Sequence, residues 1–394
     1  MKSPIFRFLL LIGLLLLPLS LQAQGELGFG EADDTTMSLA ERVTNIEQKF
    51  KSFNVYVNFN GNLHTEQSYG NDEFSTNFQA KNLRLEVKGQ IGDKIYYRIR
   101  QRLNKATNAT DDGLAKATDY AMIGYRPSPQ WLISVGKMGQ YFGGFEFDQN
   151  AIYVYQASDI SDYADGSKLG IAFTWTPTKN HTFVAQITNA LNGNLYAEYE
   201  GIEKQEIYKS KSPLTYVAHW SGQFAEGFYR TKCNVLYRSL AKDNGSTVMV
   251  LGQSINGKWG RVFLDYAFEH DDFDFMRFCS IEANKHLRSN QAYLTDLTYH
   301  GLVARTDIKI GKHLILWAEG MYQTASCGSN KKLDGFRKHY NYLAGLEYVP
   351  NPDYKVRYTL NYQGQYYDYS KKSGIPDQSV NRIEAGILCR IKCF

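Results

Sequence analysis

Proline and cysteine are scarce in this sequence, with nine Pro and five Cys among 394 residues. Few prolines fit a β-rich chain, since Pro cannot donate to a β-ladder. The cysteines all lie in the second half at irregular spacing, with no Cys-x-x-Cys pair and no paired Cys/His pattern. The sequence therefore gives no disulfide framework, and we expect no metal and no cofactor.

Long hydrophobic runs are also missing after residue 23, where none approaches the ~20 residues of a membrane-spanning helix. The formal net charge is only +4, so global charge indicates no nucleic-acid partner. Hydropathy alone would describe a soluble protein. Transmembrane β-barrels give the same impression, because half the residues of each strand face a polar lumen.

The first 23 residues, "MKSPIFRFLLLIGLLLLPLSLQA", predict a secretory signal. Lys2 and Arg7 precede an apolar run over residues 8–17, and small or polar residues continue to Ala23. We expect export through the Sec pathway and cleavage near Ala23. The alternative is a single membrane anchor, for which the apolar run has about half the needed length.

Residues 24–52 are interpreted as a periplasmic segment with one short helix. Ser38 followed by Glu41 supplies an N-cap, and apolar residues recur at helical spacing: Leu39, Val43, Ile46 and Phe50. The narrow apolar stripe suits docking under a barrel or weak self-association, and equally a simple amphipathic lead-in.

What the sequence has in abundance is aromatic residues and glycine: 29 Tyr, 22 Phe and 33 Gly. From Asn54 onward apolar residues recur at every second position, as in a strand with two different faces. Four stretches show this clearly: Val55, Val57 and Phe59; Leu83, Leu85 and Val87; Leu169, Ile171, Phe173 and Trp175; and Val356, Tyr358, Leu360 and Tyr362.

Short turns and long polar connections alternate between these stretches. Seven short turns lie at 90–93, 127–130, 177–180, 224–227, 256–258, 310–312 and 350–353. Eight longer connections lie near 65–76, 104–115, 139–166, 189–212, 240–246, 270–290, 324–338 and 370–379. This rhythm predicts an all-β fold, a transmembrane antiparallel β-barrel of about 16 strands over residues 53–394. A secreted β-sandwich has the same strand pattern but does not predict the rhythm.

The stretch "RLEVKGQIGDKIYYRIRQRL", residues 84–103, places arginines at alternate positions. Arg98, Arg100 and Arg102 share one strand face with Tyr96, while the other face carries Ile95, Tyr97 and Ile99. A charge facing lipid at the bilayer midplane costs ~2–4 kcal/mol. We therefore expect the arginine face to line the lumen.

Three motifs resemble the phosphate-selective porin O and P family, in the form common in Bacteroidota. They are "LRLEVKGQIGDKIYYRIRQRLN" (83–104), "VGKMGQYFGGFEFD" (135–148) followed by "AIYVYQASDISDY", and the helix leading into "FNVYVNFNGN". The resemblance runs from about residue 40 to the end. It implies a sixteen-stranded outer-membrane porin, anion selectivity with phosphate as the named solute, and trimers. Outer-membrane barrels usually end in an aromatic residue in step with the lipid-facing residues of the last strand. Phe394 is aromatic, but it is in step with Arg390 and Lys392 instead.

We expect the pore-lining, anion-binding residues to be Arg84, Lys88, Arg98, Arg100 and Arg102. Guanidinium groups stay charged and match oxyanions, so a row of them passes an anion between weak sites. The alternative is an arginine cluster facing acidic residues such as Glu86, Glu146 and Asp148, which orders water without selecting anions.

The longest connection, residues 139–167, is aromatic and glycine-rich, and we expect it to fold into the lumen as a constriction loop. Its candidate residues are Tyr141, Phe142, Phe145, Glu146 and Asp148. The alternative is an extracellular loop with a hydrophobic patch. Further acids at Asp159, Asp162 and Asp165 make this loop acidic, which weakens the case for phosphate.

The predicted function is a water-filled outer-membrane porin of a Gram-negative cell for small anions or other small hydrophilic solutes. Its other partners would be outer-membrane lipid and the barrel-assembly machinery. No catalytic residues are predicted, and we expect no enzyme. The competing class is a barrel with an enzymatic, structural or adhesive role; its best catalytic candidate is His270 beside Asp271, Asp272 and Asp274 in an expected loop.

Overall fold

The computed structural model describes residues 53–68, 73–106, 110–111, 113–163, 166–287, 292–351 and 355–393. The predicted signal peptide, the predicted periplasmic helix and Phe394 lie outside these residues.

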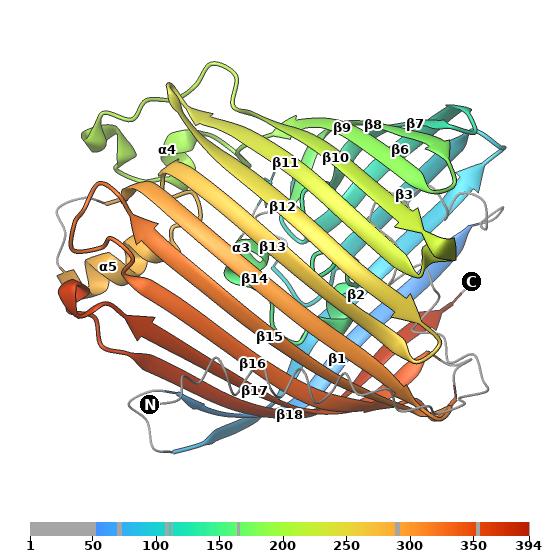
Figure 1. The fold of residues 1–394 in the computed structure, drawn as a ribbon. Coiled ribbons are helices and arrows are strands. Elements are labelled where there is room, and N and C mark those ends of the chain that lie inside the picture. The colour runs from blue at the N-terminus through green and yellow to red at the C-terminus, as the bar shows by residue number, and fades with distance from the viewer. Residues whose placement is uncertain are drawn as a thin grey trace.

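Sixteen strands within the described residues close into one antiparallel barrel, in which β18 pairs with β1 (Figure 1). These strands are β1 (Asn54–Ser68), β2 (Ser75–Ile91), β3 (Ile95–Arg102), β6 (Thr118–Ser128), β7 (Trp131–Gly139), β8 (Ser167–Thr178), β9 (His181–Asn189), β10 (Leu214–Phe224), β11 (Tyr229–Ala241), β12 (Asn244–Gly257), β13 (Gly260–Phe273), β14 (Thr295–Ile310), β15 (Leu314–Cys327), β16 (Arg337–Tyr348), β17 (Val356–Tyr369) and β18 (Gln378–Lys392). The predicted all-β fold is confirmed. Every strand pairs with its neighbours along the barrel, so no edge is left open to lipid.

The remaining elements are short and belong to the connections. They are β4 (Thr110–Asp111), β5 (Leu114–Ala115), η1 (Ala151–Tyr153), α3 (Asp159–Tyr163), α4 (Leu195–Glu198), η2 (Ile202–Gln205), η3 (Ala225–Gly227), α5 (Phe278–Leu287) and η5 (Lys371–Ser373). Figure 1 shows α4 and α5 at one rim and the short turns at the other. Among the described residues, no helix is long and apolar enough to span a membrane.

All seven predicted short turns join consecutive strands, but the long connection predicted at 240–246 is wrong. Strands β11 and β12 are separated by Lys242 and Asp243 alone, and Asp243 takes the left-handed conformation that a tight turn needs. The polar residues around it face the lumen within the ladder instead of forming a loop: Arg238 Nη1 donates to Ser246 Oγ at 2.9 Å.

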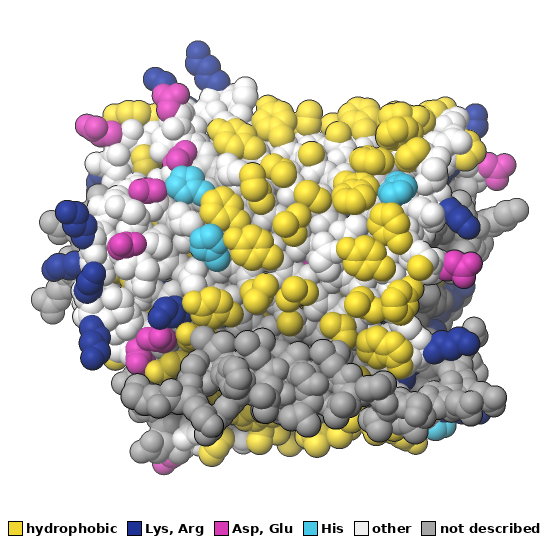
Figure 2. Space-filling model, in the orientation of Figure 1, with side chains coloured by type: hydrophobic (Ala, Val, Ile, Leu, Met, Phe, Trp, Pro, Cys, Tyr) yellow, Lys and Arg dark blue, Asp and Glu magenta, His cyan; other side chains and the backbone are white. Residues whose placement is uncertain are grey.

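The outer face of the barrel is apolar. Ile99, Val135 and Leu251 are each about half exposed there. Figure 2 shows apolar side chains spread across the middle of the wall and charged side chains gathered toward its two ends. Near the short turns the rings of Trp131 and Trp175 stack at 5.9 Å, as in the aromatic girdles of membrane barrels.

Part of the lumen is filled by an apolar core, which is separate from the apolar outer face. The inward side chains of β8–β15 include Val184, Leu236, Val248, Val250 and Leu297, all buried. Loop residues pack on them, and these are Leu191, Leu195, Tyr199, Ile202, Phe275, Phe278 and Cys279. Because this side is closed by packed side chains, open space remains on the side of β2, β3, β6, β7 and β18.

Candidate pore and its cationic wall

The described residues between β7 and β8, 140–163 and 166, lie inside the barrel and cross to the opposite wall. Tyr155 Oη donates to Glu347 on β16 at 2.9 Å, and Asn60 on β1 donates to the Ile152 carbonyl at 3.1 Å. Gln365 on β17 donates to Gln156 at 3.0 Å. We call this segment the infolded loop. It lies in the lumen, as predicted, and not outside the barrel; that it constricts the pore stays a prediction.

The three aromatic residues predicted for this loop are all buried. Tyr141 and Phe142 belong to the lumenal apolar core, and Phe145 lies 6.3 Å from Phe263, ring centre to ring centre. Gly144 allows the loop to reach the wall, because a Cβ there would lie 2.3 Å from Cγ of Asp265. That carboxylate accepts a hydrogen bond from the Glu146 amide at 2.7 Å.

The acids of the infolded loop serve mainly to hold it in place. Asp148 forms an ion pair with Lys232 on β11, and Asp159 pairs with Arg337 on β16 at 2.7 Å. Glu146 accepts hydrogen bonds from the Ser158 amide and hydroxyl and from Ser161. Of the described loop acids, only Glu146 and Asp162 also line the open cavity. The acidity of this loop is therefore weaker evidence against anions than the sequence alone indicates.

Burial beside Glu319 raises the pKa of Glu146 to about 7. The folded loop binds this proton more tightly than the unfolded chain does, so protonation of Glu146 stabilises the fold. This stabilisation is complete below pH 4.5. It is lost as the pH rises through about 7, and the full shift corresponds to about 3 kcal/mol. We expect hydrogen exchange of the Ser158 amide, corrected for intrinsic rates, to accelerate over this range.

The Glu146→Gln variant should lose this pH dependence, because its amide stays neutral. An exchange rate that stays constant from pH 4.5 to 8 in the unmodified protein would contradict the assignment.

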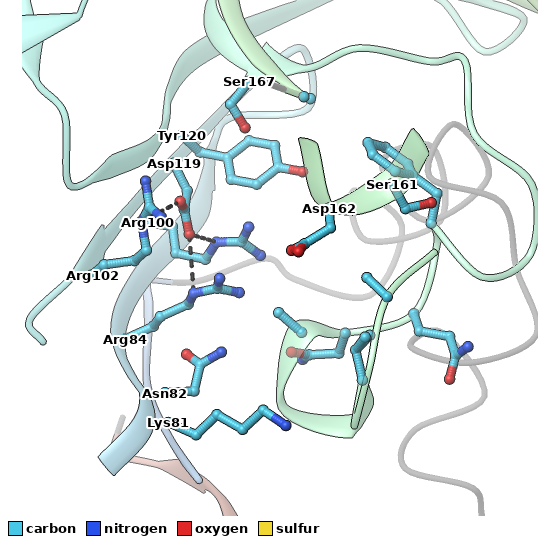
Figure 3. Close-up of a pocket in the computed structure, with 18 of the residues that line it drawn as sticks. Lys81, Asn82, Arg84, Arg100, Arg102, Asp119, Tyr120, Ser161, Asp162 and Ser167 are labelled. Carbon is cyan, nitrogen blue, oxygen red and sulfur yellow. Dashed lines mark hydrogen bonds and ion pairs between the residues drawn. The ribbon is translucent and has the colours of Figure 1, made fainter. Parts of the chain in front are cut away.

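A cavity of about 730 Å³ lies between the infolded loop and the wall of β2, β3 and β6 (Figure 3). Its described lining carries eleven basic side chains against four acidic ones. The basic residues are Lys81, Arg84, Lys88, Arg98, Arg100, Arg102, Lys116, Lys137, Arg277, Arg382 and Arg390; the acidic ones are Glu86, Asp119, Glu146 and Asp162. All five predicted pore-lining residues therefore face one cavity.

The register of the strands builds this wall. Arg84 lies opposite Arg102, and Lys88 lies opposite Arg98, so their side chains share the lumenal face. Asp119 on β6 forms ion pairs with Arg84, Arg100 and Arg102 at 3.0–3.1 Å. One carboxylate thus holds three guanidinium groups side by side, which leaves the cluster with excess positive charge.

The next arginine of β3, Arg98, has partners of its own. Arg98 pairs with Glu86 at 2.6 Å. The ring of Tyr120 lies under two guanidinium groups, 4.1 Å from Arg98 and 4.4 Å from Arg100. These contacts restrict the arginine side chains, so the wall presents charge at fixed positions.

Asp119 was missed by the sequence reasoning because of a β-bulge. The pairing of β3 with β6 shifts register between Arg100 and Gln101, which leaves Asp119 unopposed. Strict alternation would place it outward with Ala121 and Ile123. The bulge turns it into the lumen beside Tyr120, and both side chains are buried.

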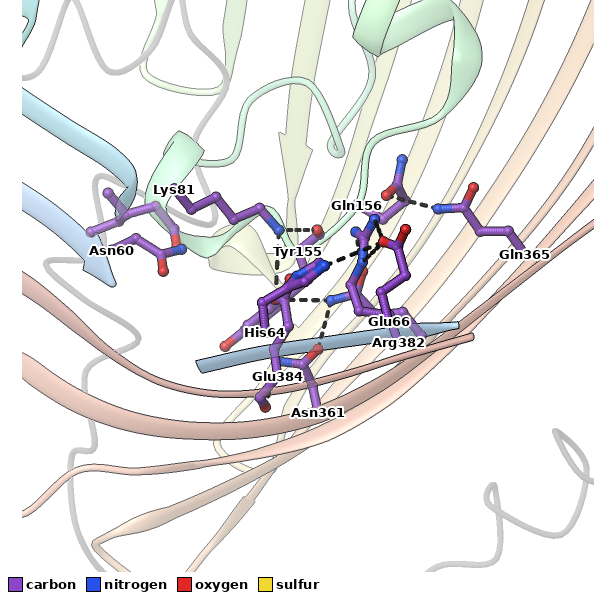
Figure 4. Close-up of polar contacts among 12 residues, drawn as sticks. Asn60, His64, Glu66, Lys81, Tyr155, Gln156, Asn361, Gln365, Arg382 and Glu384 are labelled. Atoms are coloured by element: carbon purple, nitrogen blue, oxygen red, sulfur yellow. Dashed lines mark hydrogen bonds and ion pairs between the residues drawn. The ribbon is translucent and has the colours of Figure 1, made fainter. Parts of the chain in front are cut away.

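A second polar network, also missed, adjoins the cavity on β1, β2, β17 and β18 (Figure 4). His64 lies between two carboxylates, with Nδ1 3.2 Å from Glu384 and Nε2 3.3 Å from Glu66. Arg382 pairs with Glu66 at 2.7 Å. Lys81 lies 3.7 Å from Glu384 and also donates to the Tyr155 carbonyl, which links the network to the infolded loop.

The other chemical candidates do not assemble. His270 and Asp272 lie in strand β13 and not in the expected loop, and their side chains are 3.8 Å apart and partly exposed. All five cysteines are free. In the part of the chain that the structure describes, no group of three or more His, Cys, Asp or Glu side chains is arranged to hold a metal ion.

A closed barrel with an apolar outer face, an infolded loop and a charged lumenal cavity defines an outer-membrane channel. The family model described as "Phosphate-selective porin O and P" matches residues 53–391. The chain therefore belongs to this family of outer-membrane porins.

Solved structures share the fold at low sequence identity. The outer membrane channel DcaP of Acinetobacter baumannii aligns with a TM-score of 0.59 and 13% identity, covering 86% of this chain and 96% of that one. An anion-selective porin from Comamonas acidovorans aligns at 0.56 and 9%, covering 86% and 99%. OmpF of Salmonella typhi, solved with daunomycin, aligns at 0.54 and 11%, covering 85% and 97%. A search of curated protein sequences found no match.

Proposed function

We propose that this channel conducts small anions in preference to cations, and that the arginines of β2 and β3 set the preference. The observation that carries the proposal is the cluster of Arg84, Arg100 and Arg102 around the single carboxylate of Asp119. On the opposite wall the arginines have matched acids: Arg305 pairs with Glu319 and with Asp307. Excess positive charge is thus concentrated beside the open cavity, where it attracts anions.

The test is the reversal potential of the purified protein in a planar bilayer under a potassium chloride gradient. We expect it to lie on the side of the chloride equilibrium potential. A reversal potential on the potassium side would exclude anion preference, and a protein that forms no conducting events would favour a structural or adhesive barrel.

Phosphate is a second candidate solute, supported by the family's description and by three guanidinium groups within reach of one oxyanion. We expect millimolar phosphate to reduce the chloride current through single channels. Sulfate at the same ionic strength is the control, since a general effect of a divalent oxyanion would appear with both.

We further propose that residues 1–23, whose sequence predicts a secretory signal, are removed during Sec export. We also propose that the mature protein is a trimer, as the family resemblance implies. The mass of the mature N-terminus and the mass of the detergent-solubilised protein test these two points separately.

A further inference from the structure

The infolded loop has two different faces. Its large side chains turn to the barrel wall: Tyr155 stacks on Trp317 at 4.3 Å, and Tyr153 lies 4.3 Å beneath the guanidinium of Arg357. Ile152 is buried in the same cluster. The side chains that line the cavity from this part of the loop include three small apolar ones, Ala151, Val154 and Ala157, all partly exposed.

These three side chains, which we call the apolar strip, line the same cavity as the arginine cluster, together with the polar side chains of Gln149, Asn150 and Gln156. The strip adds no charge, and the described loop acids that line the cavity are Glu146, which is held by Ser158 and Ser161, and Asp162. Burial and the neighbouring Asp159 raise the pKa of Asp162 above its usual value. An anion between the two walls therefore meets guanidinium donors on one side and, on the other, small apolar side chains beside the carboxylate of Asp162 (Figure 3).

The size of the cavity is also informative. Its volume of about 730 Å³ falls within the range of about 300–1,000 Å³ typical of sites for small organic molecules. Arg84 and Arg100 point their guanidinium groups into this space, with the Nε atoms directed at Asp119 (Figure 3). Their remaining N–H groups are placed to hold an oxyanion.

We infer that the channel favours organic anions that carry both a carboxylate or similar oxyanion and a short hydrocarbon part. The oxyanion binds the cluster of Arg84, Arg100 and Arg102, and the hydrocarbon part contacts the strip of Ala151, Val154 and Ala157. This inference rests on the proposed anion preference and names the class of solute. A small inorganic anion gains nothing from the strip, because it has no apolar surface to remove from water.

The test uses a homologous series of carboxylates, namely acetate, propionate, butyrate and valerate, as blockers of the single-channel chloride current. A fully buried methylene strengthens binding about fourfold, and contact with one wall gives less. We expect the half-blocking concentration to fall about twofold for each added methylene.

Two matched variants locate the effect. Val154→Thr keeps the shape of the side chain and adds a hydroxyl within the strip. The half-blocking concentration should then fall less for each added methylene, while block by inorganic phosphate keeps its strength. Val135→Thr makes the same chemical change on the lipid-facing side of β7, where Val135 is 54% exposed, and should keep the slope of the unmodified protein.

The outcomes separate this inference from the proposed function. If the half-blocking concentration is the same from acetate to valerate in a channel that prefers chloride over potassium, the inference alone is overturned. A slope unchanged by Val154→Thr would overturn it too, since the hydrocarbon would then be bound elsewhere. Preference for potassium would remove the proposed function and the inference together.

Discussion

Replacing Arg84, Arg100 and Arg102 together by glutamine will lower the anion-to-cation permeability ratio at least about tenfold. A unit charge about 6 Å from a permeating ion contributes about 0.7 kcal/mol in water, and 0.1 M salt roughly halves this. Three lost charges shift anion and cation energies by about 1 kcal/mol each, in opposite directions. Asp119 would remain without its three cationic partners, but eight basic side chains against four acidic ones would still line the described cavity, so the anion preference should weaken without reversing.

Two further variants make this prediction sharper. Asp119→Asn alone should raise the anion preference, because it removes the only carboxylate that the three guanidinium groups share among the described residues. Lys338→Gln removes one positive charge from the outer face, where Lys338 pairs with Asp368, and should leave the ratio unchanged. Reversal potentials give the anion-to-cation permeability ratio of the triple variant, of Asp119→Asn and of Lys338→Gln. An unchanged ratio in the triple variant, with the barrel folded by circular dichroism, would show that selectivity arises elsewhere.

Replacing Arg337 by glutamine will release the infolded loop and increase the single-channel conductance. Arg337 pairs with Asp159 at 2.7 Å, and its guanidinium packs over Phe278 and Tyr367. Removing one partner of a buried ion pair costs about 3–5 kcal/mol, because the other charge stays buried. We expect larger and noisier current steps in bilayer recordings.

The double variant Asp159→Asn with Arg337→Gln should recover part of the original conductance, since it removes the stranded charge as well. Lys338→Gln, one position along the same strand but on the outer face, is the matched control. If Arg337→Gln opens channels of unchanged conductance and noise, this ion pair does not hold the constriction.

The strand pattern could be predicted because each strand of the barrel separates lipid from lumen. Residues 95–102 follow the rule closely: Ile95 and Ile99 are exposed on the outer face, while Tyr96 and Arg98 are buried on the lumenal face. The rule weakens where the lumen is itself apolar. Val248 and Val250 face inward and Met249 faces outward, so alternation in hydropathy disappears there, although the strand remains.

The candidate site was predicted in part. The arginine ladder follows from residue spacing on one strand, and the infolded loop from its length and aromatic content. Asp119 could not be found in this way, because its orientation depends on a bulge in the pairing of β3 with β6. Lys232 and Arg337 were also missed, since each meets the loop across a sequence separation of more than 80 residues.

By itself the sequence determined the class of fold, the sixteen-strand count and the side of β3 that carries charge, because hydrocarbon outside and water inside impose a two-residue period on every strand. The tertiary structure alone decided where the open cavity lies and how its charges balance. Those properties depend on which distant side chains fill the lumen, on one irregularity in strand pairing and on the acids that the loop uses to anchor itself, none of which has a local signature in the chain.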